Sequence, residues 1–520
     1  MSANRVEVEA FGMDALKKLM RDISGPSGRD FDHKPQVEYL ESYFSTIKPL
    51  TMVIEHEYVD RDYLEDYSAY YVRCFQPYSR FCKRILFFEH PFKNEHFFEL
   101  LKGTASSLTE DLLRDTFLGF IVLKPLPFTV IGRTCLKTYQ NQGERSYPIN
   151  RKYTVHLCGI DLTIDSLAFQ EQDSVAAACA TSALWSAFHA TGYKFQHAIP
   201  TPIEITKMAA SNEIGTGRTF PNDGLTLPQM AHAVRSVGLE PHTFASIEAI
   251  TFKSSVYSYL SAGIPIVLAV KLWDTGSTPP TLVGGHAMAI TGFGERTGTP
   301  PPAIPNQMLD ESTQVNRVYV HDDGIGPFAR MELDGVSVRT PEGDRFSLST
   351  SWKSSGGTKG VVRAVPEVMI VPVYHKIRIP MRRIHTEVLQ FDKLTETIRS
   401  QGFIPSLASR LSWKIQLTTS NEVKRDVASN RTMDADYRVD LLQTPLPRFM
   451  GRAFASCGSR PIVELLFDLT GIDQAKPFLT AIPHDLIFVG EIKTVANDPA
   501  VESKWSTSPA WNLYSWFKTH

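Results

Sequence analysis

The stretch from Asp173 to Gly192 constrains this chain more than any other, because it has the pattern of a helix with a thiol near its start. Asp173 or Ser174 can cap a helix N-terminus, small and apolar residues follow at helical spacing, and Gly192 is placed as a stop. A thiol near a helix N-terminus is biased toward the thiolate, which is the nucleophile. Free cysteine is often buried, however, so on this stretch alone a Cys179 that fills the core is the commoner alternative.

The composition is that of an ordinary soluble globular protein. Of the 520 residues, 42% are apolar and 21% are charged, which is enough material for several cores. Lysine plus arginine number 54 against 56 acidic residues, so no basic excess points to nucleic acid or to an anionic membrane. The N-terminal residues lack an apolar signal region, and no apolar run is long enough to cross a bilayer. We therefore expect a cytoplasmic protein with neither nucleic-acid nor membrane partners.

The cysteines are scattered and include no closely spaced pair, so neither a disulfide framework nor a structural zinc site is indicated. They are Cys74, Cys82, Cys135, Cys158, Cys179 and Cys457. Two of them lie near histidines in the sequence, in the set Cys74, Cys82, His90 and His96. The spacing of this set matches no standard zinc pattern. We expect no metal and no cofactor.

The distribution of elements predicts an α+β protein of three domains. Residues 1–150 predict an aromatic-rich α+β domain of unknown role, without a catalytic constellation. Residues 151–374 contain the Cys179 helix and a set of β-branched strands. Residues 375–520 predict a third α+β domain, whose size makes it a candidate for recognition of a substrate or partner. The interval from 295 to 316 is longer than a simple hairpin loop and is a candidate lid.

Periodicity and punctuation predict the individual elements. The predicted strands are 51–59, 84–88, 117–124, 153–158, 162–169, 264–270, 286–293, 318–321, 367–374, 413–419, 461–469 and 485–492. The predicted helices are 62–75, 95–102, 109–114, 173–188, 202–210 and 227–237, with a polar loop at 211–224.

Three residues of the middle block form an economical set for nucleophilic catalysis. Cys179 supplies the thiol, and His286, which follows two glycines, can hold the thiolate and later protonate a leaving amine. Asp322 ends the next predicted strand, where a carboxylate can accept the second imidazole N–H and fix the tautomer. If the two strands are antiparallel neighbours, His286 and Asp322 lie at the same edge.

Each member of this set also has an ordinary structural explanation. A histidine after Gly-Gly is often a loop residue, and Asp-Asp-Gly is more often a turn than a catalytic site. The joint occurrence of Cys179, His286 and Asp322, in this order and in these element contexts, is much harder to obtain by accident.

The block from Phe169 to Tyr374 resembles papain-like cysteine peptidases, closest to the branch that trims double-glycine leaders from bacteriocins. A glutamine precedes a helix-opening cysteine, and residues 224–238 are similar to the family's helix between nucleophile and base. A strand such as 262–270 precedes the Gly-Gly-His-Ala segment, which is followed by Val-Tyr-Val-His-Asp. The resemblance implies a papain-like domain with the nucleophile on a helix and the other two residues on an antiparallel sheet.

The resemblance also implies the role of each site residue. Cys179 would be the nucleophile, His286 the general base and acid, Asp322 the orienter, and Gln172 a donor in the oxyanion hole. Gln172 stands one residue farther from the cysteine than is usual in the family, so either the loop carries one extra residue, or Gln170 or Gln172 reaches the site from a shifted register. The family's usual Asp-Pro is Asp-Asp here, which leaves Asp323 as a rival orienter.

Three functions remain open on the sequence. The first is an intracellular cysteine peptidase that cleaves a peptide or isopeptide bond of a protein substrate through a thioester. The second is a transglutaminase-like acyltransferase or deamidase with the same triad. The third is a non-catalytic scaffold with a peptidase fold. The sequence does not define the oligomeric state.

Overall fold

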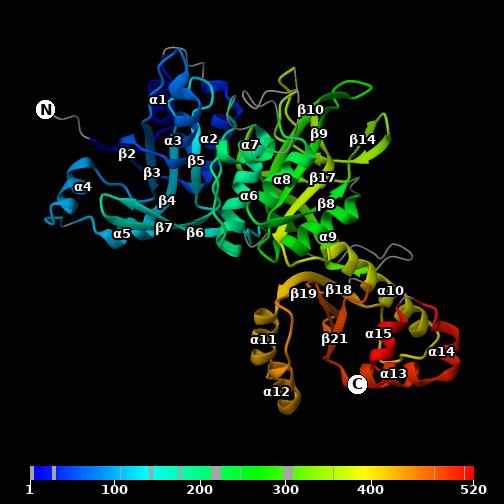
Figure 1. Ribbon diagram of the computed structural model, residues 1–520. Coiled ribbons are helices and arrows are strands. Elements are labelled where there is room, and N and C mark those ends of the chain that lie inside the picture. The colour runs from blue at the N-terminus through cyan, green and yellow to red at the C-terminus, as the bar shows by residue number, and fades with distance from the viewer. Residues whose placement is uncertain are drawn as a thin grey trace. The chain divides into compact units, whose positions relative to one another are not determined.

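The chain is a mixed α+β protein with several separate sheets (Figure 1). The computed structural model describes residues 5–25, 31–105, 107–139, 145–173, 175, 178–211, 224–245, 248–296, 308–354, 356–431, 433–472, 475–508 and 510–519. No helix within these ranges is both long enough and apolar enough to span a membrane. The α+β class expected from the sequence is confirmed.

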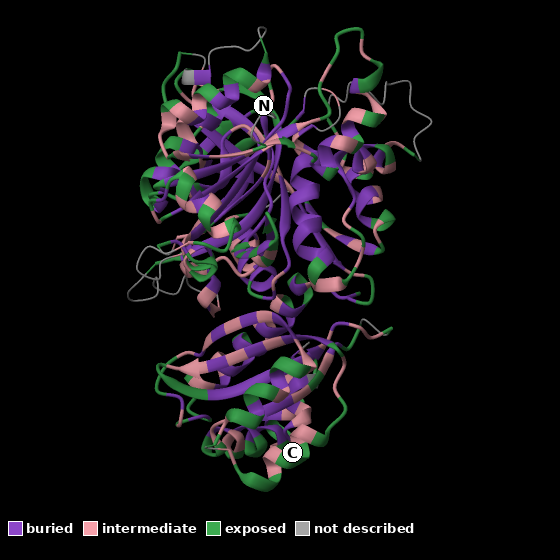
Figure 2. Cartoon of the chain, turned by 90° about the vertical axis from the view of Figure 1, so that its left-hand side faces the viewer, coloured by how far each residue is buried: buried purple, intermediate pink, exposed green. Residues whose placement is uncertain are grey.

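The chain forms two compact units. The first unit contains residues 1–247, 263–294 and 317–372, and the second contains residues 248–262, 295–316 and 373–520. The predicted boundary near residue 150 therefore falls inside the first unit, whereas the one near residue 374 lies close to a boundary between units. Buried residues concentrate in the sheets of each unit, and exposed residues in the loops and the outer helices (Figure 2).

The first sheet of the first unit is antiparallel, with the strands in sequence order. Its strands are β1 Val6–Ala10, β2 Thr51–Tyr58, β3 Cys82–Phe88, β4 Phe117–Leu123 and β5 Ile131–Leu136. The helices of this part are α1 Met13–Ser24, α2 Pro35–Ile47, α3 Arg61–Ala69, α4 Asn94–Leu101 and α5 Glu110–Thr116. Strand β4 is buried at every position, as its continuous apolar run predicts.

The second sheet has the order β13-β12-β10-β9-β17-β16, with β8 also paired to β17. Its strands are β8 Leu239–Ala245, β9 Ile266–Asp274, β10 Thr281–Glu295, β12 Val315–Asp322, β13 Gly326–Glu332, β16 Leu348–Ser349 and β17 Val362–Tyr374. Two hairpins accompany it, β6 Arg151–Leu157 with β7 Ile160–Ser166 and β14 Ser337–Thr340 with β15 Gly343–Phe346. The helices of this part are α6 Cys179–Phe195, α7 Pro202–Ala210 and α8 Leu227–Ser236.

One hydrophobic core joins the two halves of the first unit. The same cluster of buried side chains includes Phe120 of β4, Leu184 and Trp185 of α6, and Ala289 of β10. Full burial of a large apolar side chain stabilises the folded state by about 1.5–3 kcal/mol. Separating the halves would expose many such side chains and lose this stabilisation. This shared core explains why residues 1–150 do not form a compact unit of their own.

Helix α6 begins later and ends later than the sequence pattern predicts. Its first helical residue is Cys179, and the N-cap is Ala178, so neither Asp173 nor Ser174 is the cap. The Asp173 carboxylate instead accepts a hydrogen bond of 2.6 Å from the Tyr71 hydroxyl. Gly192 lies inside the helix, where a Cβ would lie 2.6 Å from a carbon of the Ile199 side chain. A glycine is therefore required here by close packing against Ile199, and not by the end of a helix.

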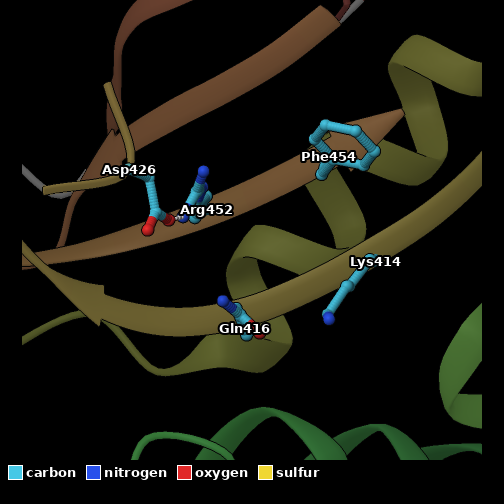
Figure 3. A pocket seen from close by; sticks show the side chains of 5 residues that line it. All are labelled: Lys414, Gln416, Asp426, Arg452 and Phe454. Carbon is cyan, nitrogen blue, oxygen red and sulfur yellow. Dashed lines mark hydrogen bonds and ion pairs between the residues drawn. The ribbon is translucent and has the colours of Figure 1, made fainter. Parts of the chain in front are cut away.

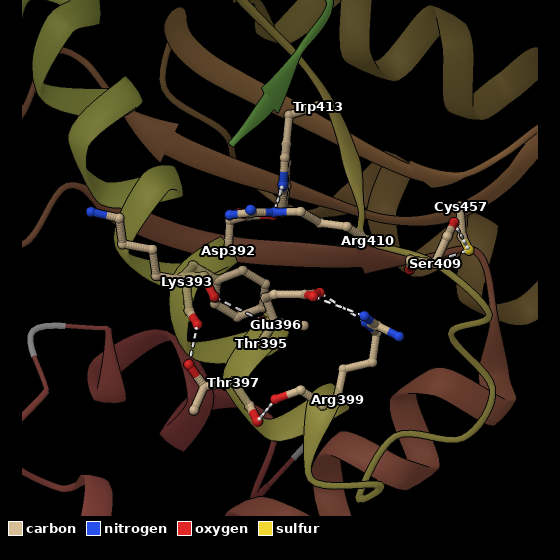
Figure 4. Close-up of polar contacts among 12 residues, drawn as sticks. Asp392, Lys393, Thr395, Glu396, Thr397, Arg399, Ser409, Arg410, Trp413 and Cys457 are labelled. Atoms are coloured by element: carbon tan, nitrogen blue, oxygen red, sulfur yellow. Dashed lines mark hydrogen bonds and ion pairs between the residues drawn. The ribbon is translucent and has the colours of Figure 1, made fainter. Parts of the chain in front are cut away.

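The second unit contains a sheet of order β11-β18-β19-β20-β21. Its strands are β11 Leu309–Asp310, β18 Ser412–Thr419, β19 Phe449–Cys457, β20 Arg460–Asp468 and β21 Phe478–Pro483. The helices are α9 Ala249–Leu260, α10 Met381–Ser400, α11 Ser420–Ser429, α12 Ala435–Gln443, α13 Leu486–Asn497, α14 Pro499–Trp505 and α15 Trp511–Trp516. A buried carboxylate joins helix α10 to the segment before and within β18 (Figure 4). Asp392 accepts hydrogen bonds from Trp413 Nε1 at 2.9 Å and from Arg410 Nε at 3.0 Å.

The strand predicted at 485–492 is wrong, because this segment begins helix α13. Asp485 caps the helix by accepting from the Phe488 backbone N–H. The buried residues Phe488, Ile492 and Val495 then recur at helical spacing. A short apolar run does not by itself distinguish a strand from a buried helix, and here the capping aspartate was the decisive signal.

Candidate active site

The three predicted site residues come from three elements of the first unit. Cys179 is the first residue of α6, His286 lies in β10, and Asp322 is the last residue of β12. Strands β10 and β12 are neighbours in the sheet, as predicted from the sequence. His286 does not open its strand, however, because β10 begins at Thr281. The two glycines before the histidine are thus strand residues.

The His286 ring connects the thiol to the carboxylate. Its Nε2 forms a hydrogen bond of 2.9 Å with Asp322 Oδ1, and an interaction with the Cys179 side chain is among the causes that raise the pKa of the ring. Because Nε2 is occupied by Asp322, Nδ1 is the ring nitrogen left for the thiol. Both His286 and Asp322 are buried, whereas Cys179 is partly exposed. This arrangement leaves the sulfur as the accessible member of the chain of contacts.

Asp322 is held by further donors besides the imidazole. Trp352 Nε1 donates to Asp322 Oδ2 at 2.9 Å, and the Gly324 backbone N–H donates to Oδ1 at 3.0 Å. The Trp352 ring also lies edge-on to the His286 ring, with 5.0 Å between centroids. Trp352 was not predicted from the sequence, since a tryptophan in a polar loop gives no signal of its contact with a distant carboxylate.

The charges in the site favour an imidazolium beside a carboxylate. Burial opposes the charged form of His286, but the Asp322 charge, the hydrogen bonds of Asp322 and Cys179, and the Asp323 charge outweigh it. Together they raise the pKa of His286 well above its usual range. Burial likewise opposes ionisation of Asp322, but the His286 charge and the donors of Asp322 lower its pKa below the usual value.

Asp323, the rival orienter, is near the imidazole but does not hold it. Its Oδ1 lies 3.7 Å from His286 Nε2, beyond hydrogen-bond distance, and its buried Oδ2 has no hydrogen-bond partner among the described residues. Burial raises the pKa of Asp323 to about 7; the positive charge of His286 opposes this rise, and the negative charge of Asp322 adds to it. Of the two carboxylates, Asp322 is the one bonded to the ring.

The segment that contains the predicted oxyanion-hole residue is fixed on both sides of it. Gln172 is exposed, and its neighbours Glu171 and Asp173 are buried. Glu171 forms an ion pair with Lys34 and accepts from the Ile131 backbone N–H at 3.2 Å. The alternative Gln170 is buried. The role of Gln172 stays a prediction.

His286, Asp322 and Asp323 are the only group among the described residues that has the composition and spacing of a metal site. His286, Asp322 and Asp323 offer ligand atoms that lie within 4.8 Å of one another. Imidazole and carboxylate groups suit several divalent cations. Yet His286 Nε2 and Asp322 Oδ1 are hydrogen bonded to each other, so a cation between them would have to replace that bond. The set Cys74, Cys82, His90 and His96 is not among such groups within the described ranges.

The second histidine of the Val-Tyr-Val-His-Asp segment has a structural environment. His321 is buried, its Nδ1 lies 3.4 Å from Ser186 Oγ, and its ring contacts Phe169 and Phe328. Burial lowers the pKa of His321 to about 3, which keeps its ring neutral. Of the two histidines, His286 is the one bonded to Asp322.

The described part of the candidate lid belongs to the second unit. Residues 297–307 lie outside the described residues, as does most of the predicted loop at 211–224. Residues 309–310 form β11, which pairs with β18. The lid therefore stays a prediction.

The second unit has a cleft of about 280 Å³ on β18, β19 and α11 (Figure 3). It is lined by Lys414, Gln416, Asp426, Arg452 and Phe454. Arg452 is already bound by Asp426 and, at 2.7 Å, by Glu464. The described residues that line this cleft include no cysteine, serine or threonine, and the set Cys179, His286 and Asp322 lies in the first unit.

No protein-family model matches the chain, and no curated protein sequence matches it.

Proposed function

We propose that this protein is a papain-like cysteine peptidase that cleaves a peptide or isopeptide bond of a protein substrate. The observation that carries the proposal is the contact chain Cys179–His286–Asp322, which is assembled from a helix N-terminus and two neighbouring strands. A thiol, an imidazole and a carboxylate in this order are the elements of an acyl-transfer triad.

The reaction begins with the Cys179 proton on the His286 ring. The sulfur attacks the carbonyl carbon, and the carbonyl oxygen becomes an oxyanion near the start of α6, where backbone N–H groups point outward. The C–N bond breaks as His286 gives its proton to the leaving amine, which leaves a thioester on Cys179. A water then gives a proton to His286 and attacks the thioester, releasing a carboxylic acid and restoring the thiol.

Asp322 holds the imidazole in the orientation that this cycle requires. Its bond to Nε2 leaves Nδ1 directed at the thiol, and its charge stabilises the imidazolium in each half of the reaction. All the cysteines are free, so a reducing compartment suits the nucleophile, and we place the activity inside the cell.

The test is incubation of the full chain with a peptide library in water enriched in oxygen-18. Hydrolysis predicts new C-termini that carry the heavy oxygen, formed by the wild type and not by Cys179→Ala or His286→Ala. A deamidase would instead convert glutamine to glutamate without new termini, and an acyltransferase would need an added amine. No turnover, together with an unreactive thiol, would favour the scaffold and overturn the proposal.

A further inference from the structure

Helix α2 contacts the two loops that hold the orienting carboxylate. It lies far from them in the sequence, within residues 1–150, whose role the sequence left unknown and where it showed no catalytic constellation. One loop is the turn from Asp322 to Pro327, and the other contains Trp352. The contacts of α2 with these loops are specific and polar.

The first contact is made beside the proposed triad. Gln36 Nε2 donates a hydrogen bond of 2.9 Å to the backbone carbonyl of Asp323, and both residues are buried. The accepting carbonyl belongs to the residue directly after Asp322. Leaving a buried carbonyl without a donor costs about 1–3 kcal/mol of stability. This bond therefore favours the position of the turn in which the Asp323 carbonyl meets Gln36.

The second contact fits the turn between two aromatic rings. Tyr39 Oη donates to the Pro327 carbonyl at 2.7 Å, and a Cβ on Gly326 would lie 2.3 Å from the Tyr39 ring. On the other side, a Cβ on Gly324 would lie 2.6 Å from the Trp352 ring. The turn thus passes between α2 and Trp352 with no space for a side chain at either glycine.

The third contact joins α2 to the loop of Trp352 itself. Glu38 pairs with Lys353 at 2.7 Å and with Lys359 at 3.3 Å. The hydrogen bond from Lys353 lowers the pKa of Glu38, although burial opposes this effect. A cleft of about 460 Å³ lies beside these contacts, and its lining includes Glu38 and Tyr39 of α2, Ile325 of the turn and Lys353 of the Trp352 loop.

We infer that α2 is a positioning element of the site and that Gln36 is its positioning residue. The inference rests on the proposed function, since it assigns α2 the task of holding Asp322 and Trp352 against the His286 ring. The N-terminal part of the chain is then part of the catalytic apparatus, and a partner that moved α2 would change the reactivity of Cys179.

The test uses the full-length chain with Gln36→Leu, which keeps the volume of the side chain and removes the donor. The first readout is hydrogen exchange of the Trp352 indole N–H, followed with nitrogen-15 tryptophan and assigned with Trp352→Phe. The second is the ratio of Cys179 alkylation rates by iodoacetamide at pH 7 and pH 9. We expect exchange to accelerate and the ratio to fall, each by about tenfold, as expected for a loss of about 1.4 kcal/mol.

Glu41→Gln is the matched control, because Glu41 lies on the same helix but is exposed and pairs only with Lys17 among the described contacts. It should change neither readout. If Gln36→Leu folds poorly, Tyr39→Phe removes a single hydrogen bond and should shift both readouts in the same direction. Unchanged indole exchange in both variants overturns the inference. A wild-type Cys179 that is no more reactive than an ordinary thiol overturns the proposed function instead, and the exchange result still decides the role of α2.

Discussion

At the scale of single residues, the two adjacent aspartates differ in what they do to the imidazole. Asp322 is bonded to the His286 ring and to Trp352, whereas Asp323 has a buried oxygen without a described partner. The sequence could not show which of the two orients the ring. The side chains of adjacent residues at a strand end point in different directions, and the conformation of the turn determines which of them faces His286. The donors Trp352 and Gln36 could not be predicted either, because they come from segments that are distant in the sequence.

Asp322→Asn is therefore expected to reduce Cys179 alkylation at pH 7, and any peptide hydrolysis, by at least about 100-fold. An amide in this position removes the charge that stabilises the imidazolium and can favour the wrong ring orientation. Asp323→Asn is the matched control and should reduce the same rates by less than about tenfold, because Asp323 makes no hydrogen bond to the ring. Equal losses in both variants would contradict the assignment of Asp322 as the orienter.

Asp323 also predicts a pH dependence of stability. Its pKa is raised to about 7, so between about pH 4 and pH 7 the native state retains a proton that the unfolded chain releases. The wild type then loses stability as the pH rises through this window. Asp323→Asn should remove the loss, and its gain in free energy of unfolding over the wild type should grow by a few kcal/mol from about pH 4 to about pH 8. Urea unfolding at several pH values measures this; a gain that is constant with pH would contradict it.

At the scale of elements, the sequence predicted strands with regular patterns and missed helix boundaries set by distant contacts. Strands 51–58 and 117–123 agree with their alternating or continuous apolar runs. The start of α6 could not be predicted, because Asp173, the best capping residue, is engaged by Tyr71 of another element. The side-by-side strands of His286 and Asp322 were predicted correctly, since strands that follow each other along the chain are usually neighbours in a sheet, even though the interval between these two is long.

The turn after β12 predicts an effect of a single methyl group. Gly326 has a φ of +156°, and its Cβ would meet the Tyr39 ring at 2.3 Å. Gly326→Ala should lower the free energy of unfolding by about 2–4 kcal/mol, from overpacking and backbone strain together. Gly335→Ala is the control, since Gly335 has a φ of +82° but open space around its Cα, and should cost only about 1 kcal/mol. Equal costs in thermal or urea unfolding would contradict the packing argument.

At the scale of the whole molecule, the predicted division into three domains differs from the two units that the contacts define. The sequence could not show this, because the apolar residues of β4 and α6 pack together only through the fold. A fragment of residues 151–374 should therefore not fold alone, while residues 1–374 retain the shared core. Far-ultraviolet circular dichroism and cooperative unfolding of both fragments test this. A cooperatively folded 151–374 fragment would contradict the single core.

The central claim is that Cys179 and His286 form an activated pair, and competition between thiols tests it most directly. Cys158 is exposed to reagents, and partial desolvation of its thiol raises its pKa. It therefore serves as an unactivated reference in the same chain. With limiting iodoacetamide at pH 7, followed by peptide mass mapping, Cys179 should be labelled at least about tenfold faster than Cys158. His286→Ala should abolish this advantage without changing Cys158. Faster labelling of Cys158 in the wild type, or no effect of His286→Ala on Cys179, would contradict the account.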